Sequence, residues 1–134
     1  MNRIVVINFG HPLSDLSHTR ISEFLDTLGW IYIHRRLYVS FSNPLVPQIV
    51  NVVNEVEKIL MEQHGMRLEQ AGRVCMITPG LSDPAVLLAM ELIGRTGEFP
   101  SMFFQKKDMK IGGYHVYDWS DGYKLKNDAR GRRS

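Results

Sequence analysis

The stretch IVVINFGHPLS at residues 4–14 places a strand directly before the start of a helix, and VCMITPGLSDP at residues 74–84 repeats this arrangement. Each stretch begins with a short apolar run, which is typical of a strand buried on both faces of a parallel sheet. Glycine and proline then turn the chain, and an amphipathic helix follows. Because open parallel sheets bind ligands at the carboxyl ends of their strands, these two corners predict a binding site.

The rest of the chain alternates between the same kinds of element. Apolar residues recur at helical spacing in three segments, which are residues 13–28, 46–60 and 84–93. Residues 30–41 instead alternate with period two, which predicts a long amphipathic strand that bends or divides near Arg35. Residues 101–105 predict another strand, and residues 114–119 an edge strand or an interface segment. This β-α-β-α-β-α-β order predicts an α/β protein with a mainly parallel sheet and helices on both faces.

The composition is that of one compact, soluble domain. Of the 134 residues, 44% are hydrophobic and 22% charged, which is ordinary for a globular protein. The single cysteine, Cys75, excludes a disulfide framework and fits a cytoplasmic location. The N-terminal sequence lacks the apolar core of a signal peptide, and no run approaches the ~18 apolar residues of a membrane span. We therefore expect no membrane association.

Positive charge is concentrated at the end of the chain. Residues 124–134 contain five Lys/Arg and one Asp (+4), whereas the other 123 residues carry 11 Lys/Arg and 13 Asp/Glu (−2). We therefore divide the chain into an α/β domain at residues 1–123 and a basic tail at residues 124–134, which we expect to be flexible. Such a tail is either a solvated, frayed terminus or an arm that binds nucleic acid.

The first corner carries three residues suited to binding. Gly10 permits close approach to the backbone, Asn8 offers a donor and an acceptor, and the imidazole of His11 titrates near neutrality. Equally, Asn8 and His11 can serve only to satisfy backbone groups of the turn.

The second corner, Gly80 to Asp83, offers backbone amides and the Ser82 hydroxyl. These groups suit a phosphodiester, but Ser82 or Asp83 can equally cap the following helix. Lys106 and Lys107 follow the next strand at the same edge, where they either face phosphates or are solvated.

Several kinds of site have no support in the sequence. Neither G-x-G-x-x-G nor G-x-x-x-x-G-K-[ST] occurs, so we expect no dinucleotide cofactor and no nucleoside triphosphate site. The five histidines lie on different predicted elements without metal-ligand spacing, and we expect no metal. Cys75 lies in the middle of a strand, away from either corner, which argues against a nucleophilic role.

Taken together, INFGHPL at residues 7–13 and PGLSDPAVLLAMELIGRTGEFP at residues 79–100 resemble the small Csx-fifteen family of type III CRISPR accessory proteins. The match covers residues 4–30 and 73–104, and says nothing of residues 107–134. The resemblance implies a CARF-like, Rossmann-like fold that is usually dimeric. It also implies a cyclic oligoadenylate as ligand, cyclic tetra-adenylate above all, and a role in ending that signal. The family pattern maps onto seven corner residues, Asn8, His11, Pro12, Pro79, Gly80, Leu81 and Ser82.

We therefore predict a ligand site at both corners and the nearby strand end, made of Asn8, Phe9, Gly10, His11, Pro12, Pro79, Gly80, Leu81, Ser82 and Lys106. A ring of repeated adenines and phosphates can lie across a two-fold axis and meet the same corner from each subunit, which favours a homodimer or higher homo-oligomer. The apolar segment 84–93 must lie within the core or at such an interface.

Two modes of action fit this site. The protein can sequester the ligand, or it can open the ring slowly and without metal through attack of an adenosine 2′-hydroxyl, with His11 as the candidate acid–base residue. Two other functions stay open. One is a small nucleotide-processing enzyme on the same fold, and the other is an interaction protein that binds nucleic acid through its basic tail. We expect no stable binding of DNA.

Overall fold

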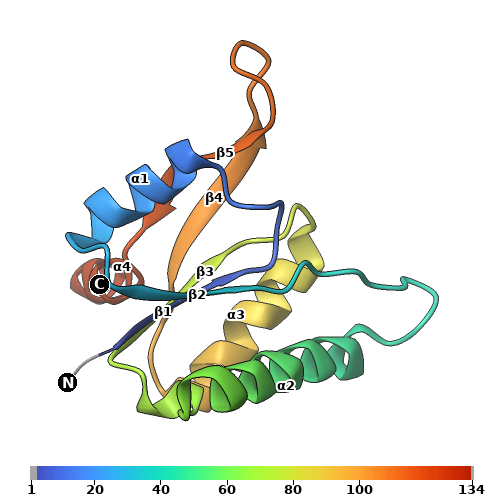
Figure 1. The fold of residues 1–134 in the computed structure, drawn as a ribbon. Helices are drawn as coiled ribbons and strands as arrows, with labels where there is room; N and C mark the ends of the chain where they lie inside the picture. The colour runs from blue at the N-terminus through green and yellow to red at the C-terminus, as the bar shows by residue number, and fades with distance from the viewer. Residues whose placement is uncertain (1–2, 134) are drawn as a thin grey trace.

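A five-stranded sheet forms the centre of the protein in the computed structural model, which describes residues 3–133 (Figure 1). The strands lie in the order β2-β1-β3-β4-β5. The first four are parallel and β5 is antiparallel to β4, which confirms the predicted α/β class and mainly parallel sheet. In chain order the elements are β1 (Ile4–Asn8), α1 (Asp15–Leu25), β2 (Trp30–His34), α2 (Leu45–His64), the 3-10 turn η1 (Leu68–Gln70), β3 (Arg73–Ile77), α3 (Ser82–Thr96), β4 (Ser101–Lys107), β5 (Tyr114–Ser120) and α4 (Gly122–Gly131).

Strand β1 has a parallel neighbour on each side. Asn8, its last residue, lies in register with His34 of β2 and with Ile77 of β3. Val5, Val6 and Ile7 are completely buried, as the continuous apolar run predicts.

Alternate residues of the central strands enter two separate hydrophobic clusters, because successive side chains point to opposite faces of a sheet. Val5 and Ile7 pack with residues of α2 and α3, whereas Val6 and Cys75 pack with residues of α1. Figure 1 shows α1 on one side of the sheet and α2 with α3 on the other. Burial raises the pKa of the Cys75 thiol to about 12, so the thiol stays protonated and is a poor nucleophile at neutral pH.

Strand β2 is shorter than the sequence suggests. The sequence predicts a strand over residues 30–41 that bends or divides near Arg35, and β2 does end at His34, but no second strand follows over residues 35–41. Two more backbone hydrogen bonds follow, from Arg35 N to Asn8 O and from Leu37 N to Phe9 O. The pairing then stops because the first corner turns the neighbouring chain away at Gly10.

Helix α3 packs against the core along one stripe and presents apolar side chains to solvent on another. Leu88 and Leu92 are fully buried, while Val86 and Met90 are 60% and 62% exposed. An apolar helix with one exposed apolar face is typical of an interface.

Most of the segment that we expected to be a flexible tail is helical. Helix α4 spans Gly122–Gly131 and begins two residues before the predicted boundary at 123/124. The periodicity of residues 122–131 is obscured by their high charge, which is why a helix was not predicted there. Within residues 3–133, no helix combines the length and apolarity needed to cross a membrane.

Candidate functional site

The strand order places the two predicted corners on either side of a topological switch point. From β1 the chain passes through α1 to β2 on one side, whereas from β3 it passes through α3 to β4 on the other. The two strands are direct neighbours, and Phe9 N donates to Ile77 O over 3.1 Å just beyond their ends. In open α/β sheets, the crevice outside the carboxyl ends of strands at such a point is where ligands bind.

Asn8 organises the first corner from a completely buried position. Its Oδ1 accepts a hydrogen bond from Gly10 N at 2.8 Å. Its Nδ2 donates to His11 O at 2.7 Å and to the Tyr32 hydroxyl at 2.9 Å. Both amide hydrogens and the carbonyl oxygen thus have partners within the protein, and the side chain fixes the shape of the corner.

The side chain of Gln105, from strand β4, lies close against the backbone of Gly10. A Cβ atom at this position would collide with Gln105 Oε1 and lie 3.1 Å from Thr78 O. The Gln105 side chain uses this approach to hold the next residue. It accepts from His11 N at 2.9 Å and donates to His11 O at 3.1 Å. The first corner is therefore fastened to β4, across the intervening strand β3.

The His11 ring lies flat on the ring of Tyr114 from β5, with centroids 3.4 Å apart and planes 10° from parallel. Burial, and then the positive charge of Arg36, lower the pKa of His11 below its ordinary value of 6.5. His11 is therefore neutral at pH 7 and can accept a proton. Because its folded-state pKa is depressed, its contribution to stability is present above pH 6.5 and is lost as the pH falls through the folded-state pKa.

Strand β5 is tied to the start of α1, which holds Tyr114 in place. Ser14 caps α1 by accepting from Ser17 N, and its hydroxyl lies 2.8 Å from His115 Nδ1. Ser17 Oγ accepts from Val116 N at 2.8 Å. Sequence reasoning did not find the two contacts with β5, because each joins residues about 100 positions apart.

The second corner is exposed and its helix is uncapped. Gly80, Leu81 and Ser82 are solvent-exposed, and α3 begins at Ser82 with Leu81 in the N-cap position. The expectation that Ser82 or Asp83 caps this helix is wrong, since no side chain makes a capping hydrogen bond and both residues are already helical. Ser82 and the first-turn amides are thus left facing solvent.

The structure brings some predicted site residues together and separates others. Phe9 and Pro79 are buried, so their side chains are not available to a ligand at the surface. Pro12 is exposed beside His11, and Lys106 is exposed on β4 with its Nζ 4.7 Å from the centroid of the Tyr117 ring. Four residues absent from the prediction complete the surroundings of the first corner, Tyr32, Arg36, Gln105 and Tyr114. The polar Gln105, which directly follows the run SMFF at residues 101–104, was the one signal in the sequence for this group.

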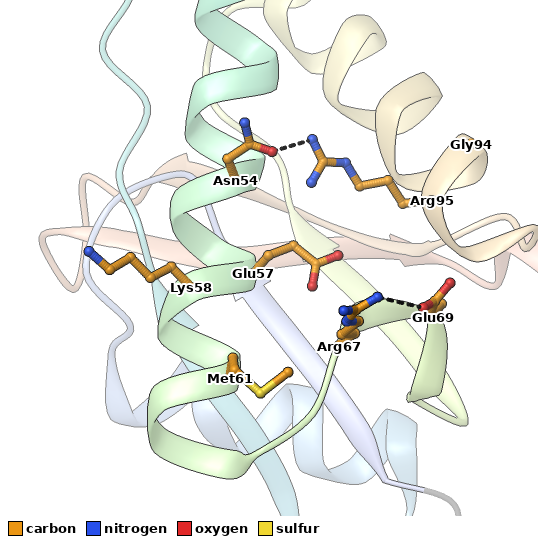
Figure 2. Close-up of a pocket in the computed structure, with 8 residues that line it drawn as sticks. All are labelled: Asn54, Glu57, Lys58, Met61, Arg67, Glu69, Gly94 and Arg95. Carbon is orange, nitrogen blue, oxygen red and sulfur yellow. Dashed lines mark hydrogen bonds and ion pairs between the residues drawn. The ribbon is translucent and has the colours of Figure 1, made fainter.

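A groove lies away from the corners, between α2, η1 and the end of α3 (Figure 2). Its volume is about 690 Å³, but its polar groups already have partners in the protein. Arg95 bonds to Glu91 and to Asn54, and the guanidinium of Arg67 lies 3.6 Å from Glu69. Glu57 accepts from Leu68 N. Because few groups remain to orient a ligand, this groove is a weaker candidate than the corners.

Across residues 3–133, no three His, Cys, Asp or Glu side chains gather as metal ligands would. Comparison of the chain with models of protein families, with curated proteins and with solved structures gives no significant match. What the chain binds must therefore be inferred from its residues and their geometry.

The hydrogen bonds of Asn8 predict that this residue is needed for stability. Asn8→Ala leaves the buried Gly10 N–H without its partner, and we expect a loss of about 1–3 kcal/mol in the free energy of unfolding, measured by urea denaturation. Ser82→Ala, at the exposed second corner, is the matched control and should change stability by less than about 0.5 kcal/mol. Equal stability of both variants and the parent chain would contradict the assigned role of Asn8.

Proposed function

We propose that the chain binds a cyclic oligoadenylate, cyclic tetra-adenylate above all, at the carboxyl edge between β1 and β3, and so down-regulates type III CRISPR signalling. The observation that carries the proposal is the strand order, which sets the two corners on opposite sides of the switch point. These are the same corners that resemble the Csx-fifteen family, and the ligand class and the CARF-like identity of the fold come from that resemblance.

The chemistry of the edge suits adenine and phosphate. The stacked rings of His11 and Tyr114 offer a flat aromatic surface of the kind on which bases stack. The Ser82 hydroxyl and the uncapped start of α3 can donate hydrogen bonds to a phosphate. The exposed ammonium groups of Lys106 and Lys107 add positive charge at the same edge.

We further propose that two chains associate next to these corners. Val86 and Met90 of α3 and Val46 of α2 are exposed, and Met90 and Val46 line a shared groove of about 210 Å³. Both helices begin at the carboxyl edge of the sheet, so a two-fold axis through this patch would bring two copies of the site together. A cyclic ligand has internal symmetry that such a pair of sites can match.

In this proposal the protein acts by sequestration, with at most slow ring opening. Neutral His11 can accept the proton of an attacking 2′-hydroxyl, and the Ser82 hydroxyl or Lys106 can stabilise developing negative charge. The described residues offer no cluster of metal ligands and no activated nucleophile of their own. Cleavage would therefore be metal-independent. Its rate would depend on how well the bound ligand's own 2′-hydroxyl is aligned with the phosphate that it attacks.

Substitutions at each corner should weaken binding without unfolding the protein. We expect His11→Ala and Ser82→Ala each to reduce the affinity for cyclic tetra-adenylate by about 5- to 150-fold, the scale of a lost hydrogen bond to a charged group. Isothermal titration calorimetry measures this loss, and His64→Ala, at the far end of α2, serves as the control. If both corner variants bind as the parent chain does, the site lies elsewhere.

Charge placed on the exposed face of α3 should prevent association. Light scattering of the parent chain at micromolar concentration should give at least twice the 15.4 kDa chain mass. Met90→Glu should reduce this to the mass of a monomer, because it puts a carboxylate into the apolar patch. Leu28→Glu changes a residue that is 76% exposed in the turn after α1 and should leave the mass unchanged. A monomeric parent chain, with and without ligand, would refute the proposed dimer.

Sequestration and catalysis differ in stoichiometry. With labelled cyclic tetra-adenylate in tenfold excess, we expect most of the ligand to stay cyclic, and any linear product to form slowly and equally in EDTA and in magnesium. His11→Ala should abolish that slow product if His11 is the proton acceptor. Rapid multiple turnover that requires magnesium would contradict the proposed action while leaving the binding site intact.

A further inference from the structure

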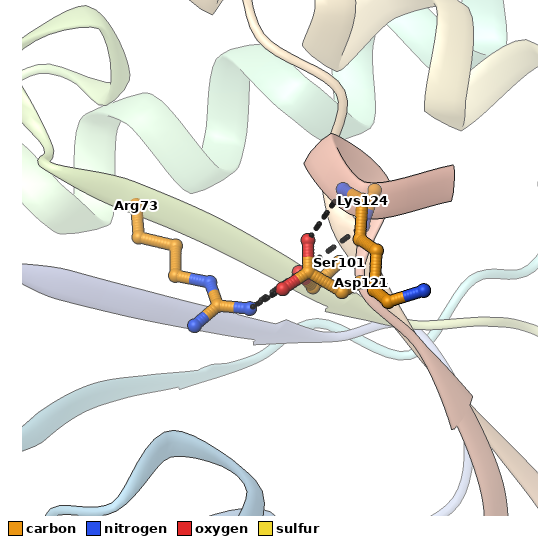
Figure 3. A network of polar contacts seen from close by, with 5 residues as sticks. Arg73, Ser101, Asp121 and Lys124 are labelled. Atoms are coloured by element: carbon orange, nitrogen blue, oxygen red, sulfur yellow. Dashed lines mark hydrogen bonds and ion pairs between the residues drawn. The ribbon is translucent and has the colours of Figure 1, made fainter. Parts of the chain in front are cut away.

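Helix α4 is fixed to the amino edge of the sheet, opposite the corners, by a polar network (Figure 3). Asp121 caps the helix by accepting from Lys124 N at 3.0 Å, and its other oxygen lies 3.3 Å from Arg73 Nη2. The same Arg73 nitrogen donates to Ser101 Oγ at 2.9 Å. Gly122 packs so closely on the backbone of Phe99 that a Cβ atom there would lie 2.7 Å from the Phe99 carbonyl oxygen.

A groove of about 470 Å³ runs between α4 and the start of β4. This volume is within the ~300–1,000 Å³ range of ligand sites. Its floor is apolar and is formed by Pro100, Met102, Leu125 and Ala129. Its charged rim consists of Lys126, Arg130 and Arg133, and no acidic side chain lines it.

The cations of this rim are available to a ligand. The single acidic residue of α4, Asp128, pairs with Lys124 at 2.7 Å. Within residues 3–133, Lys126, Arg130 and Arg133 form no ion pair with an acidic side chain. The groove thus presents three positive charges, two from α4 and one from Arg133 just beyond its end. Such a group favours an anion with several charges in a row.

Two exposed aromatic rings accompany these cations. The Nζ atom of Lys126 lies 5.5 Å from the ring centroid of Phe99 and 5.6 Å from that of Tyr123. The two rings are 45% and 64% exposed. Cations beside exposed rings are the combination by which proteins bind single strands, because phosphates contact the cations while bases stack on the rings.

In place of the expectation from the sequence that no DNA is bound stably, we propose that the groove between α4 and β4 binds single-stranded nucleic acid. Its phosphates would lie on Lys126, Arg130 and Arg133, and a base would stack on Phe99 or Tyr123. An acidic peptide would use the cations but would leave the two rings without a matching partner. This site is separate from the corners, which lie at the other edge of the sheet, and does not depend on the function proposed for them.

The test uses the full chain and a fluorescein-labelled, adenine-free 10-nucleotide strand, (CU)5 as RNA and (CT)5 as DNA. Fluorescence anisotropy should show binding with a slope of log K against log[salt] of about −2, since each neutralised phosphate of a single strand contributes about −0.7. Lys126→Glu/Arg130→Glu should reduce affinity at least tenfold. Lys58→Glu/Arg67→Glu changes the net charge equally on another face and should change affinity less than twofold.

The aromatic contribution is tested separately. Tyr123→Leu and Phe99→Leu retain every cation, and at least one should lower affinity about tenfold, the scale of a lost stacking contact. Circular dichroism and thermal melting check that each variant is folded. The proposal is overturned if neither strand binds, if the two charge-reversal variants behave alike, if both leucine variants bind normally, or if a duplex of the same length binds as tightly. Preferential binding of an acidic decapeptide or of anionic vesicles would overturn it too.

Discussion

The side-chain amide of Asn8 is the constraint on which the carboxyl edge depends. A polar group without access to water must find hydrogen-bond partners inside the protein, and Asn8 finds them in Gly10, His11 and Tyr32. These bonds turn the chain immediately after β1 and fix the backbone of Gly10 and His11 at the carboxyl edge of the sheet. Since β1 lies between two parallel neighbours, the turn cannot shift without breaking strand pairs on both sides.

The hairpin of β4 and β5 fixes the position of His11, the residue that follows the turn made by Asn8. Gln105 holds both backbone groups of His11, and Tyr114 supplies the ring beneath the imidazole. The hairpin is itself held by Ser14 and Ser17 at the start of α1. Residues from the first and the last third of the chain therefore form one unit, so the geometry of His11 requires the whole sheet to be assembled.

Patterns along the chain were sufficient to predict the alternating elements, the mainly parallel sheet and the position of both corners, because these follow from local periodicity and turn residues. The partners of the corners were not predictable. Gln105 and Tyr114 reach His11 through a register between β4 and β5 that includes a bulge after Phe104, and periodicity carries no information on register. For the same reason, the early end of β2 depends on where its neighbour turns away rather than on its own alternation.

The basic residues near the end of the chain were likewise predictable only in part. Composition located the positive charge in the last eleven residues, but not the helix that carries it. Arg73 and Asp121 join the start of that helix to the sheet, and Lys126 of the helix lies beside Phe99. A preorganised surface loses less conformational entropy when a ligand binds than a flexible tail does. In the proposed nucleic-acid site, binding to cations held on α4 would therefore cost less entropy than binding to the same cations on a flexible tail.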